Sequence, residues 1–264
     1  MFNLNKYLDL HKGESCYIFG NGPSIKWFDL SVFSDYVGIS TGSFPFHKDF
    51  SKTNVKYHAL VEPWYYCPTF MQPFKVLKET KPLQIKQKEL MSKYKELNSE
   101  YKNLDFFINV TNFPFATGAN ITYLHRKLIT KNSKLYDIKK NHDPFQGSFH
   151  TTLCLAYLMG FSNIYLVGFD AWTIQPARTM RWFEYGQGEY INTSNFAIDF
   201  LNILNNQMDI YTISLDGESC NVKNINYEQY ANKKPDFKEN YQLLSKENFN
   251  MLDSVPQYSM TKNP

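Results

Sequence analysis

Paired cysteines, metal-ligand clusters and long apolar runs are all missing from this sequence of 264 residues. The four cysteines lie far apart and form no Cys-x-x-Cys pair, which excludes the common zinc motifs and provides no disulfide framework. No run of about 18 apolar residues occurs, so no transmembrane helix is expected. Residues 1–12 lack the apolar centre of a secretory signal. These absences predict a cytoplasmic protein, for which peripheral membrane contact and a homo-oligomeric state both stay open.

Motifs that bind phosphate through a metal ion are also absent. The P-loop pattern GxxxxGK[ST] does not occur, and no Asp-x-Asp pair is present to hold a divalent cation. The net charge of +3 is too small to indicate a nucleic-acid partner by itself, although it suits a small ligand that carries phosphate. We therefore assign no metal ligand and no cofactor, and nucleic acid is a disfavoured partner.

Short apolar runs alternate with helical patterns from residue 16 to residue 214. Residues 16–19 form an apolar run that ends in a glycine-rich loop, and an amphipathic stretch follows at 25–30, which predicts a strand, a tight loop and a helix. Residues 151–160 predict a buried helix, and residues 164–167 a strand. Further strands are expected at 36–39, 57–61 and 209–214, and a further helix at 195–204. This alternation indicates an α/β fold with a Rossmann-like, mostly parallel sheet and helices on both faces.

The chain is expected to form one domain with two appendages. Residues 1–220 would make the Rossmann-like domain itself. Within it, a segment at about 74–105 is rich in Lys, Glu and Gln, which predicts a solvated helical insertion or lid. After Cys220 the sequence turns polar, and residues 221–264 are predicted to be a loosely attached C-terminal extension.

The loop Gly20-Asn21-Gly22-Pro23-Ser24 follows a predicted strand and opens a predicted helix. Open α/β sheets bind phosphates at this position, because glycines let backbone N–H groups approach the ligand and the helix dipole favours negative charge. Ser24 could serve both as the N-cap and as a hydroxyl donor to phosphate. The loop lacks the third glycine of the dinucleotide fingerprint, so a tight turn without a ligand is the alternative.

A second loop is expected at the same edge of the sheet. Gly168 and Asp170 follow the strand at 164–167, and ligands in such sheets bind across the carboxyl ends of neighbouring strands. Asp170 is a candidate to bind a ribose or sugar hydroxyl or a base edge, with a helix N-cap as its alternative. Ser148, at the start of the preceding helix, offers a third anion site. His150 is either a packed core histidine or a catalytic group.

Residues 171–190 combine cations, carboxylates and aromatic rings in one predicted loop. Arg178 and Arg181 could neutralise a diphosphate or a sugar carboxylate. Glu184 or Glu189 could act as a general base toward a hydroxyl group. This composition predicts an active-site loop, and the alternative is a solvated loop with incidental ion pairs.

The strand at 57–61 brings further polar and aromatic side chains to this edge. His58 lies within that strand, and Glu62 and the aromatic run at 64–66 follow it. We expect these side chains to close the same crevice.

Two segments resemble a known family, the bacterial sialyltransferases of glycosyltransferase family 42, typified by the Campylobacter lipooligosaccharide enzymes. The similarity covers Ile18–Ile25 and Ser148–Asp170, where a serine-led helix, a glycine-aromatic break and an Ile-Tyr-Leu-x-Gly-x-Asp strand follow one another. The resemblance implies a Rossmann-like, GT-A-like domain with a lid, and metal-independent transfer of sialic acid from CMP-sialic acid. It also implies a nucleotide held by the matching residues, which are Asn21, Gly22, Ser148, Gly168 and Asp170.

The sequence departs from the pattern of this family at three places. Trp172 stands where the family has a tyrosine that contacts phosphate, so an indole N–H would replace a phenol hydroxyl. Phe145 takes the place of an arginine. Thr193 occupies the position of the general-base histidine in a Tyr-Ile-x-His pattern, and threonine cannot be the base. Another group must then remove the acceptor proton, or the reaction is not sialyl transfer. The candidates are Glu189, Glu184 and His150.

The sequence therefore predicts a metal-independent glycosyltransferase that moves a sugar from a nucleotide-activated, CMP-linked donor to the hydroxyl group of a glycan or other acceptor. The same motifs also resemble the MptE-like proteins, which include pterin diphosphokinases and flagellin-associated glycosyltransferases. A pyrophosphate transfer from ATP that requires Mg²⁺ is thus an alternative. A transferase acting on a modified phage DNA base and a non-catalytic nucleotide- or glycan-binding protein are the remaining hypotheses.

Overall fold

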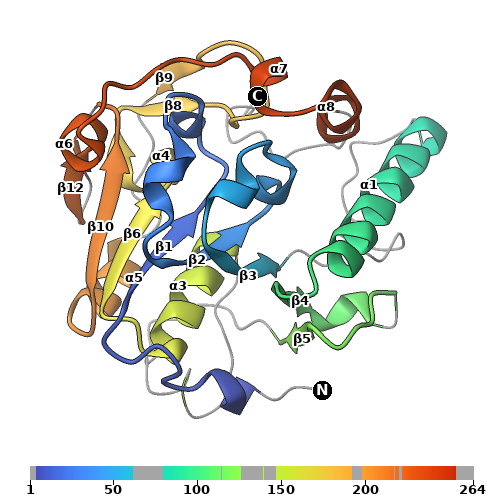
Figure 1. Ribbon diagram of the computed structural model, residues 1–264, viewed down its shortest axis with the longest axis horizontal. Coiled ribbons are helices and arrows are strands. Elements are labelled where there is room, and N and C mark those ends of the chain that lie inside the picture. Colours follow the sequence, from blue (N-terminus) through green and yellow to red (C-terminus); the bar gives the residue numbers. More distant parts are fainter. Residues whose placement is uncertain are drawn as a thin grey trace.

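An eight-stranded parallel sheet forms the centre of the fold, in the order β12-β10-β6-β1-β2-β3-β4-β5 (Figure 1). The computed structural model describes residues 4–61, 80–113, 115–125, 139, 147–191, 198–216, 218–219 and 222–253. The strands of the sheet are β1 (Ser15–Phe19), β2 (Val37–Thr41), β3 (Val55–Leu60), β4 (Asp105–Asn109), β5 (Ile121–Leu124), β6 (Asn163–Val167), β10 (Asp209–Ser214) and β12 (Lys223–Asn226).

The chain changes direction across the sheet at β1. From β1 it runs outward through β2, β3, β4 and β5, and it then returns to β6 on the other side of β1. Cys16 to Phe19 of β1 are fully buried, as expected for a central strand covered on both faces. The carboxyl ends of β1 and β6 therefore flank a topological switch point, where open α/β sheets bind their ligands.

Helices cover both faces of the sheet, and this confirms the predicted fold class. On one face lie α3 (Ser148–Met159) and α5 (Ile198–Asn205), with Phe149, Leu153 and Leu204 in the same apolar core as Ile18. Gly160 ends α3 in the left-handed conformation at φ +84°, where a glycine avoids the strain of a side chain. The other face carries α1, the short 3-10 helices between β1 and β3, and the C-terminal helices.

The segment after β1 differs from the predicted helix. It forms two short 3-10 helices, η2 (Pro23–Lys26) and η3 (Leu30–Phe33), because Asp29 begins a new turn by accepting the N–H of Ser31. Gly22, and not Ser24, is the N-cap residue of η2, with Pro23 at its first position. The expectation that Ser24 caps this helix is therefore wrong.

Helix α1 (Thr80–Glu100) lies inside the segment predicted as a helical insertion. Its buried side chains Leu90, Tyr94 and Leu97 recur on one helical face and join the second apolar core. The polar residues of this segment lie on the opposite face of the helix, which is exposed to solvent. The strand β4 begins at Asp105, where the insertion was expected to end. Residues 62–79 lie outside the described part of the chain.

Residues 223–253 are integral to the domain, which corrects the expectation of a loosely attached extension. Strand β12 pairs with β10 at the edge of the sheet. The helices α6 (Tyr227–Ala231), α7 (Asn240–Leu243) and α8 (Lys246–Asp253) follow it. Tyr227, Leu243 and Leu252 are almost fully buried in the second core. The few apolar residues of this segment are thus enough to attach it.

The predicted active-site loop contains short regular elements. After the single-turn helix α4 (Asp170–Thr173), strand β7 (Ile174–Gln175) pairs with β11 (Glu218–Ser219), and β8 (Ala177–Thr179) pairs with β9 (Glu189–Ile191). Figure 1 shows β8 and β9 on the same side of the molecule as α7 and α8. Within the described residues, no helix has both the length and the apolar character needed to cross a bilayer.

Candidate functional site

The loops after β1 and β6 touch each other at the carboxyl edge of the sheet. The N–H of Gly20 donates to the carbonyl of Val167 at 2.8 Å, and the N–H of Gly22 donates to the carbonyl of Gly168 at 2.6 Å. A Cβ atom on Gly22 would lie 2.0 Å from Oδ2 of Asp170. The two glycines are thus required by the close approach of the loops, as expected for a backbone that leaves room only for hydrogen.

Ser24 and Asp170 fasten these two loops together. The hydroxyl of Ser24 donates to Oδ2 of Asp170 at 2.9 Å, and the backbone N–H of Ser24 donates to the same atom at 3.3 Å. Burial raises the pKa of the Asp170 carboxyl, while the bonds from Ser24 act in the opposite direction. Both side chains are buried, so they bind each other inside the protein and hold the two loops of the site together.

Asn21 connects the glycine loop to two further segments. Its Oδ1 accepts the N–H of Ser43, after β2, at 3.2 Å and the indole Nε1–H of Trp182 at 3.3 Å. Gly42 has φ +61°, and a Cβ there would lie 2.0 Å from Nδ2 of Asn21. Among the described residues, the Nδ2 amide group of Asn21 has no hydrogen-bond partner. Asn21 is half-buried, so this edge of the sheet holds one partly exposed N–H donor group.

The start of α3 brings Ser148 and His150 to the same edge. Gly147, with φ +92°, is the N-cap residue, and Ser148 is the first residue of the helix. The ring of His150 lies 4.7 Å from that of Phe200 and 5.9 Å from that of Trp172. His150 is therefore packed among aromatic rings, which favours the first of its two expected roles.

Trp172 lies over the start of α3. Its indole stacks on Phe149 with ring centroids 5.3 Å apart and an interplanar angle of 5°. Trp172 is half-buried, and its ring also lies 5.9 Å from that of His150. Offset stacking of this kind holds an aromatic ring in one orientation. The tertiary structure thus places the predicted segments around Asn21, Ser148 and Trp172 at one edge of the sheet.

Lys26 holds the segment 181–189 against this edge, a role that sequence reasoning missed. Its side chain is fully buried, and Nζ donates to the carbonyls of Glu184 and Gly186, the latter at 2.6 Å. Burial lowers the pKa of Lys26, and the neighbouring Glu239 and Glu184 carboxylates oppose that shift. The only signal in the sequence was a lysine within the apolar stretch at 25–30.

Arg181 and Glu184, predicted as a phosphate ligand and a base, bind each other. The backbone N–H of Arg181 donates to Oε2 of Glu184 at 2.8 Å, and Nη1 lies 3.4 Å from Oε1. Glu189 is exposed on β9, opposite Thr179 of β8. Of the two predicted bases, Glu184 therefore has both carboxylate oxygens engaged by Arg181, whereas Glu189 is open to solvent.

Arg178 forms a small cluster with residues that the sequence did not single out. Its guanidinium lies 4.2 Å from the ring centroid of Tyr190 and 5.1 Å from that of Trp27. Nη2 donates to the Tyr190 hydroxyl and lies 3.3 Å from Oδ2 of Asp216, which also accepts the Tyr190 hydroxyl. The Nε atom of Arg178 is buried and has no hydrogen-bond partner within the described chain.

His58 lies in the core and does not border the crevice, contrary to expectation. It is fully buried on β3, where Nδ1 is 2.8 Å from the hydroxyl of Ser40. Burial lowers its pKa to about 3, so the ring is neutral. Other residues considered in the sequence lie outside the described part of the chain. These are Glu62, residues 64–66, Phe145 and Thr193.

Metal ligands do not gather within the described residues, since no group of three or more His, Cys, Asp or Glu side chains there could hold a metal ion. A cavity of about 550 Å³ occurs elsewhere, between α1 and the segment before β5. It lies at the opposite edge of the sheet and contains none of the predicted site residues.

Comparisons with solved structures agree with this architecture. The MAf glycosyltransferase from Magnetospirillum magneticum AMB-1 matches with a TM-score of 0.50 and 12% identity, over 94% of this chain and 38% of that one. This chain therefore spans well under half the length of that protein. At this identity the match supports the shared fold and nothing finer.

Two sialyltransferases from Campylobacter jejuni match less well. CstII has a TM-score of 0.46 and 16% identity over 91% of this chain and 99% of the other. An alpha-2,3-sialyltransferase has a TM-score of 0.41 and 15% identity over 96% and 90%. Both scores are too low to carry an argument. No protein-family model matches the sequence, and no curated protein matches it significantly.

Proposed function

We propose that this protein is a sialyltransferase-like glycosyltransferase, which moves a sugar from a CMP-linked donor to an acceptor hydroxyl without a metal ion. One observation carries the proposal. The loops after β1, β2 and β6 contact one another at the switch point of the sheet, through Asn21, Ser43 and Gly168, and α3 begins at the same edge. Ligands of open α/β sheets bind at such points. The sialyltransferase-like segments Ile18–Ile25 and Ser148–Asp170 supply three of these four elements, all except the loop after β2.

The nucleotide would lie over Gly20–Ser24 and against the start of α3. Gly20 and Gly22 allow this loop to lie directly against the loop after β6, because a Cβ atom on either would clash with the carbonyl of Gly168. The N-terminus of α3 offers backbone N–H groups and the positive end of a helix dipole to the phosphate. Nδ2 of Asn21 would add a side-chain donor, and Ser148 a hydroxyl.

The leaving CMP phosphate would be stabilised by positive charge or by N–H donors from the segment after β6. Arg178 is the first candidate, since its Nε–H has no partner among the described residues, although Asp216 neutralises part of its charge. Arg181 is the second, although Glu184 already neutralises part of its charge. The indole of Trp172 is the third. A donor that is fixed before the reaction stabilises developing charge more effectively than solvent does.

Deprotonation of the acceptor hydroxyl needs a base within hydrogen-bond reach. Glu189 is the leading candidate because it is exposed on β9, in the same hairpin as Arg178. Glu184 is the weaker candidate because Arg181 binds both of its carboxylate oxygens. His150 remains the competing candidate at the start of α3.

A nucleotide-release assay tests the proposal directly. The full chain is incubated with CMP-N-acetylneuraminic acid, a UDP-sugar or a GDP-sugar, each with and without a glycan acceptor, and free nucleotide is measured. We expect CMP release that depends on acceptor and persists in EDTA. A thermal-shift series with CMP, UDP, GDP and ATP identifies the nucleotide independently, because a ligand of the native state raises the apparent stability.

The main alternative gives the opposite pattern. A pyrophosphate transfer from ATP should require Mg²⁺, since metal ions neutralise the phosphates in that chemistry. Two results together would replace the proposed function with the pyrophosphokinase hypothesis. ATP would stabilise the protein only when Mg²⁺ is present, and no nucleotide would be released from any sugar donor.

A further inference from the structure

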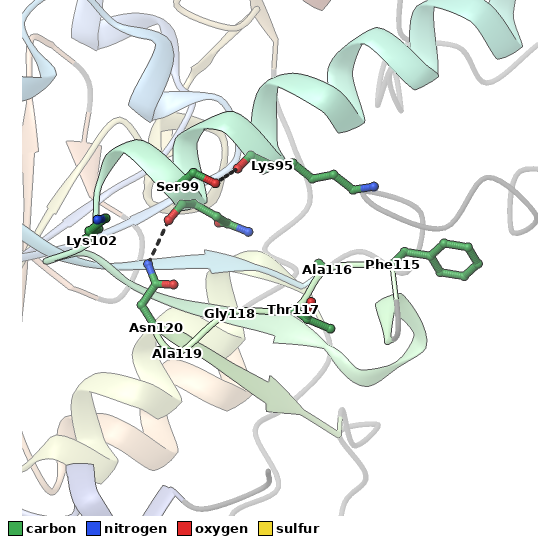
Figure 2. Close-up of a pocket in the computed structure, with 10 residues that line it drawn as sticks. Lys95, Ser99, Lys102, Phe115, Ala116, Thr117, Gly118, Ala119 and Asn120 are labelled. Carbon is green, nitrogen blue, oxygen red and sulfur yellow. Dashed lines mark hydrogen bonds between the residues drawn. The ribbon is translucent and has the colours of Figure 1, made fainter.

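A cavity of about 550 Å³ opens between the end of α1 and the segment that precedes β5 (Figure 2). Its lining residues are Lys95, Asn98, Ser99, Lys102, Phe115, Ala116, Thr117, Gly118, Ala119 and Asn120. Helix α1 leads into the start of β4, and residues 118–120 lead into the start of β5. The cavity therefore lies at the amino edge of the sheet, whereas the glycine loop lies at the carboxyl edge.

The charges that line this cavity are of one sign. Lys95 lies in the last turns of α1 and Lys102 lies just after the end of that helix, and none of the lining residues is acidic. Within the described chain, neither ammonium group forms an ion pair. Lys93 of the same helix differs, because it binds both Glu96 and Glu247 at 3.1 Å. Two uncompensated positive charges thus face one cavity.

An ordinary structural role for these lysines would be to bind the carbonyl groups at the end of α1. Asn120 has that role, because its Nδ2 donates to the carbonyl of Asn98 in the last turn of α1 at 3.3 Å and to the carbonyl of Leu104, just after the helix, at 3.0 Å. Figure 2 shows the Asn120 side chain directed at the helix end, with Lys95 extended along the cavity. The side-chain amide of Asn120 binds the carbonyl at the end of the helix. Binding of that carbonyl therefore does not explain why the two lysines lie at this cavity.

The remaining lining groups suit a ligand larger than a simple ion. The volume falls within the range typical of small-molecule sites, about 300–1,000 Å³. Ser99 and Thr117 provide hydroxyl groups for hydrogen bonds, and Gly118 exposes backbone. Phe115 adds an aromatic ring that is 43% exposed. This combination of cations, hydroxyl groups and one aromatic ring suits a sugar that carries a negative charge.

We propose that the cavity between Lys95, Lys102 and residues 115–120 binds an anionic sugar, whose phosphate or carboxylate is attracted by these two lysines. The site lies at the opposite edge of the sheet from the transfer site and does not depend on the proposed transferase activity. Phosphate and carboxylate share this chemistry, and direct binding distinguishes them. Both lysines are exposed, and attraction between exposed charges weakens as salt rises, because the Debye length falls to about 3 Å at 1 M.

The test is binding to the full chain by NMR and calorimetry, with glucose 6-phosphate, N-acetylneuraminic acid and uncharged glucose as probes. We expect at least one charged sugar to bind and glucose not to, with shifts at the backbone amides of Thr117 and Gly118. The K95Q/K102Q variant should weaken that binding at least tenfold, and raised salt should weaken it in the wild type. The pair K12Q/K234Q removes the same charge from exposed positions elsewhere and should bind as the wild type does.

Three results would overturn the proposal. The first is the absence of binding of either charged sugar at millimolar concentration, with no amide shifts near Thr117. The second is equal affinity in K95Q/K102Q and in the wild type, when unfolding curves show that both are folded. The third is an equal loss in K12Q/K234Q, which would assign the effect to net charge. None of these three results depends on CMP release. The sugar-binding proposal and the proposed transferase function can therefore be refuted independently of each other.

Discussion

Oδ1 of Asn21 accepts the indole N–H of Trp182 at 3.3 Å, and the backbone carbonyl of Asn21 accepts the backbone N–H of Trp182 at 3.1 Å. This double contact joins the glycine loop after β1 to the segment after β6, 161 residues away. Trp182 is fully buried, so the contact is protected from solvent. The position of the 181–189 segment is thereby coupled to the loop where the nucleotide is proposed to bind.

Asn21→Asp is expected to weaken nucleotide binding at least tenfold, or about 1.4 kcal/mol. A carboxylate still accepts the bond from Trp182, but it removes the Nδ2 donor and places a negative charge beside the phosphate. Calorimetry with CMP gives the affinity. Asn202→Asp, at an exposed position on α5, is the charge-matched control and should leave it unchanged. Unaltered CMP affinity in the Asn21 variant would remove this loop from the site.

Gly22→Ala is expected to destabilise the fold by roughly 1–3 kcal/mol or more, the usual scale of overpacking. The new Cβ would lie 2.0 Å from Oδ2 of Asp170 and 2.7 Å from the carbonyl of Gly168, so the two loops must separate. Urea unfolding measures the loss, and CMP affinity should fall with it. Gly13→Ala is the comparison: no atom lies within 4 Å of its Cβ, although its φ of +83° is strained. Gly13→Ala should lower the free energy of unfolding without changing the affinity for CMP.

Glu189→Gln is expected to lower turnover by about a hundredfold while leaving donor affinity nearly intact, since losing a general base has this scale. Glu184→Gln should have a smaller effect, because Glu184 is bound to Arg181. Turnover and donor affinity are measured separately for each variant. Full turnover in both glutamine variants, together with a large loss in His150→Ala, would move the base to the start of α3.

Acid should destabilise the fold through His47, which is buried beside Trp182 with ring centroids 4.9 Å apart. Burial lowers the pKa of His47 to about 4, from about 6.5 in the unfolded chain. Between these values the unfolded state binds the proton and the folded state does not. Stability therefore falls as pH drops from about 6.5 to 4, by at most about 1.4 kcal/mol per pH unit for this group.

His47→Gln is expected to make that decline shallower, as measured by urea unfolding at several pH values. Carboxyl groups such as Asp29, whose pKa is lowered mainly by its hydrogen bond from Lys233, also lose their stabilising effect at lower pH. The informative quantity is therefore the difference in slope between variant and wild type above pH 4. An identical slope in both proteins would contradict a neutral, buried His47.

The strands and helices nearest the switch point could be predicted from the sequence because they are apolar and end in glycine. The expected strand at 16–19 is β1, the one at 164–167 is β6, and Gly160 ends α3 as expected. The strand β12 was missed, since its sequence Lys-Asn-Ile-Asn has only one apolar residue. An edge strand is paired and covered on fewer sides, so its sequence carries a weaker signal.

Contacts within the site were largely beyond sequence reasoning. The predicted residues Asn21, Ser24 and Asp170 do meet at one edge, because neighbouring parallel strands end together. Ser24 donates to Asp170, and Arg181 binds Glu184, because of the way the loops fold back. Local sequence patterns contain no signal for that folding. Lys26 is the clearest example: it resembles a solvated lysine in the sequence, but it lies buried beneath the carbonyls of Glu184 and Gly186.

The sequence by itself determined the α/β alternation, the central strands and the two glycine loops, because periodicity and glycine spacing are local properties of the chain. Only the tertiary structure decided which polar groups face each other. It closed Ser24 onto Asp170, left Nδ2 of Asn21 without a partner among the described residues, and attached residues 223–253 to the sheet. The physical reason is that these contacts join segments that are distant in the chain, and their geometry exists only after the sheet and its two cores have formed.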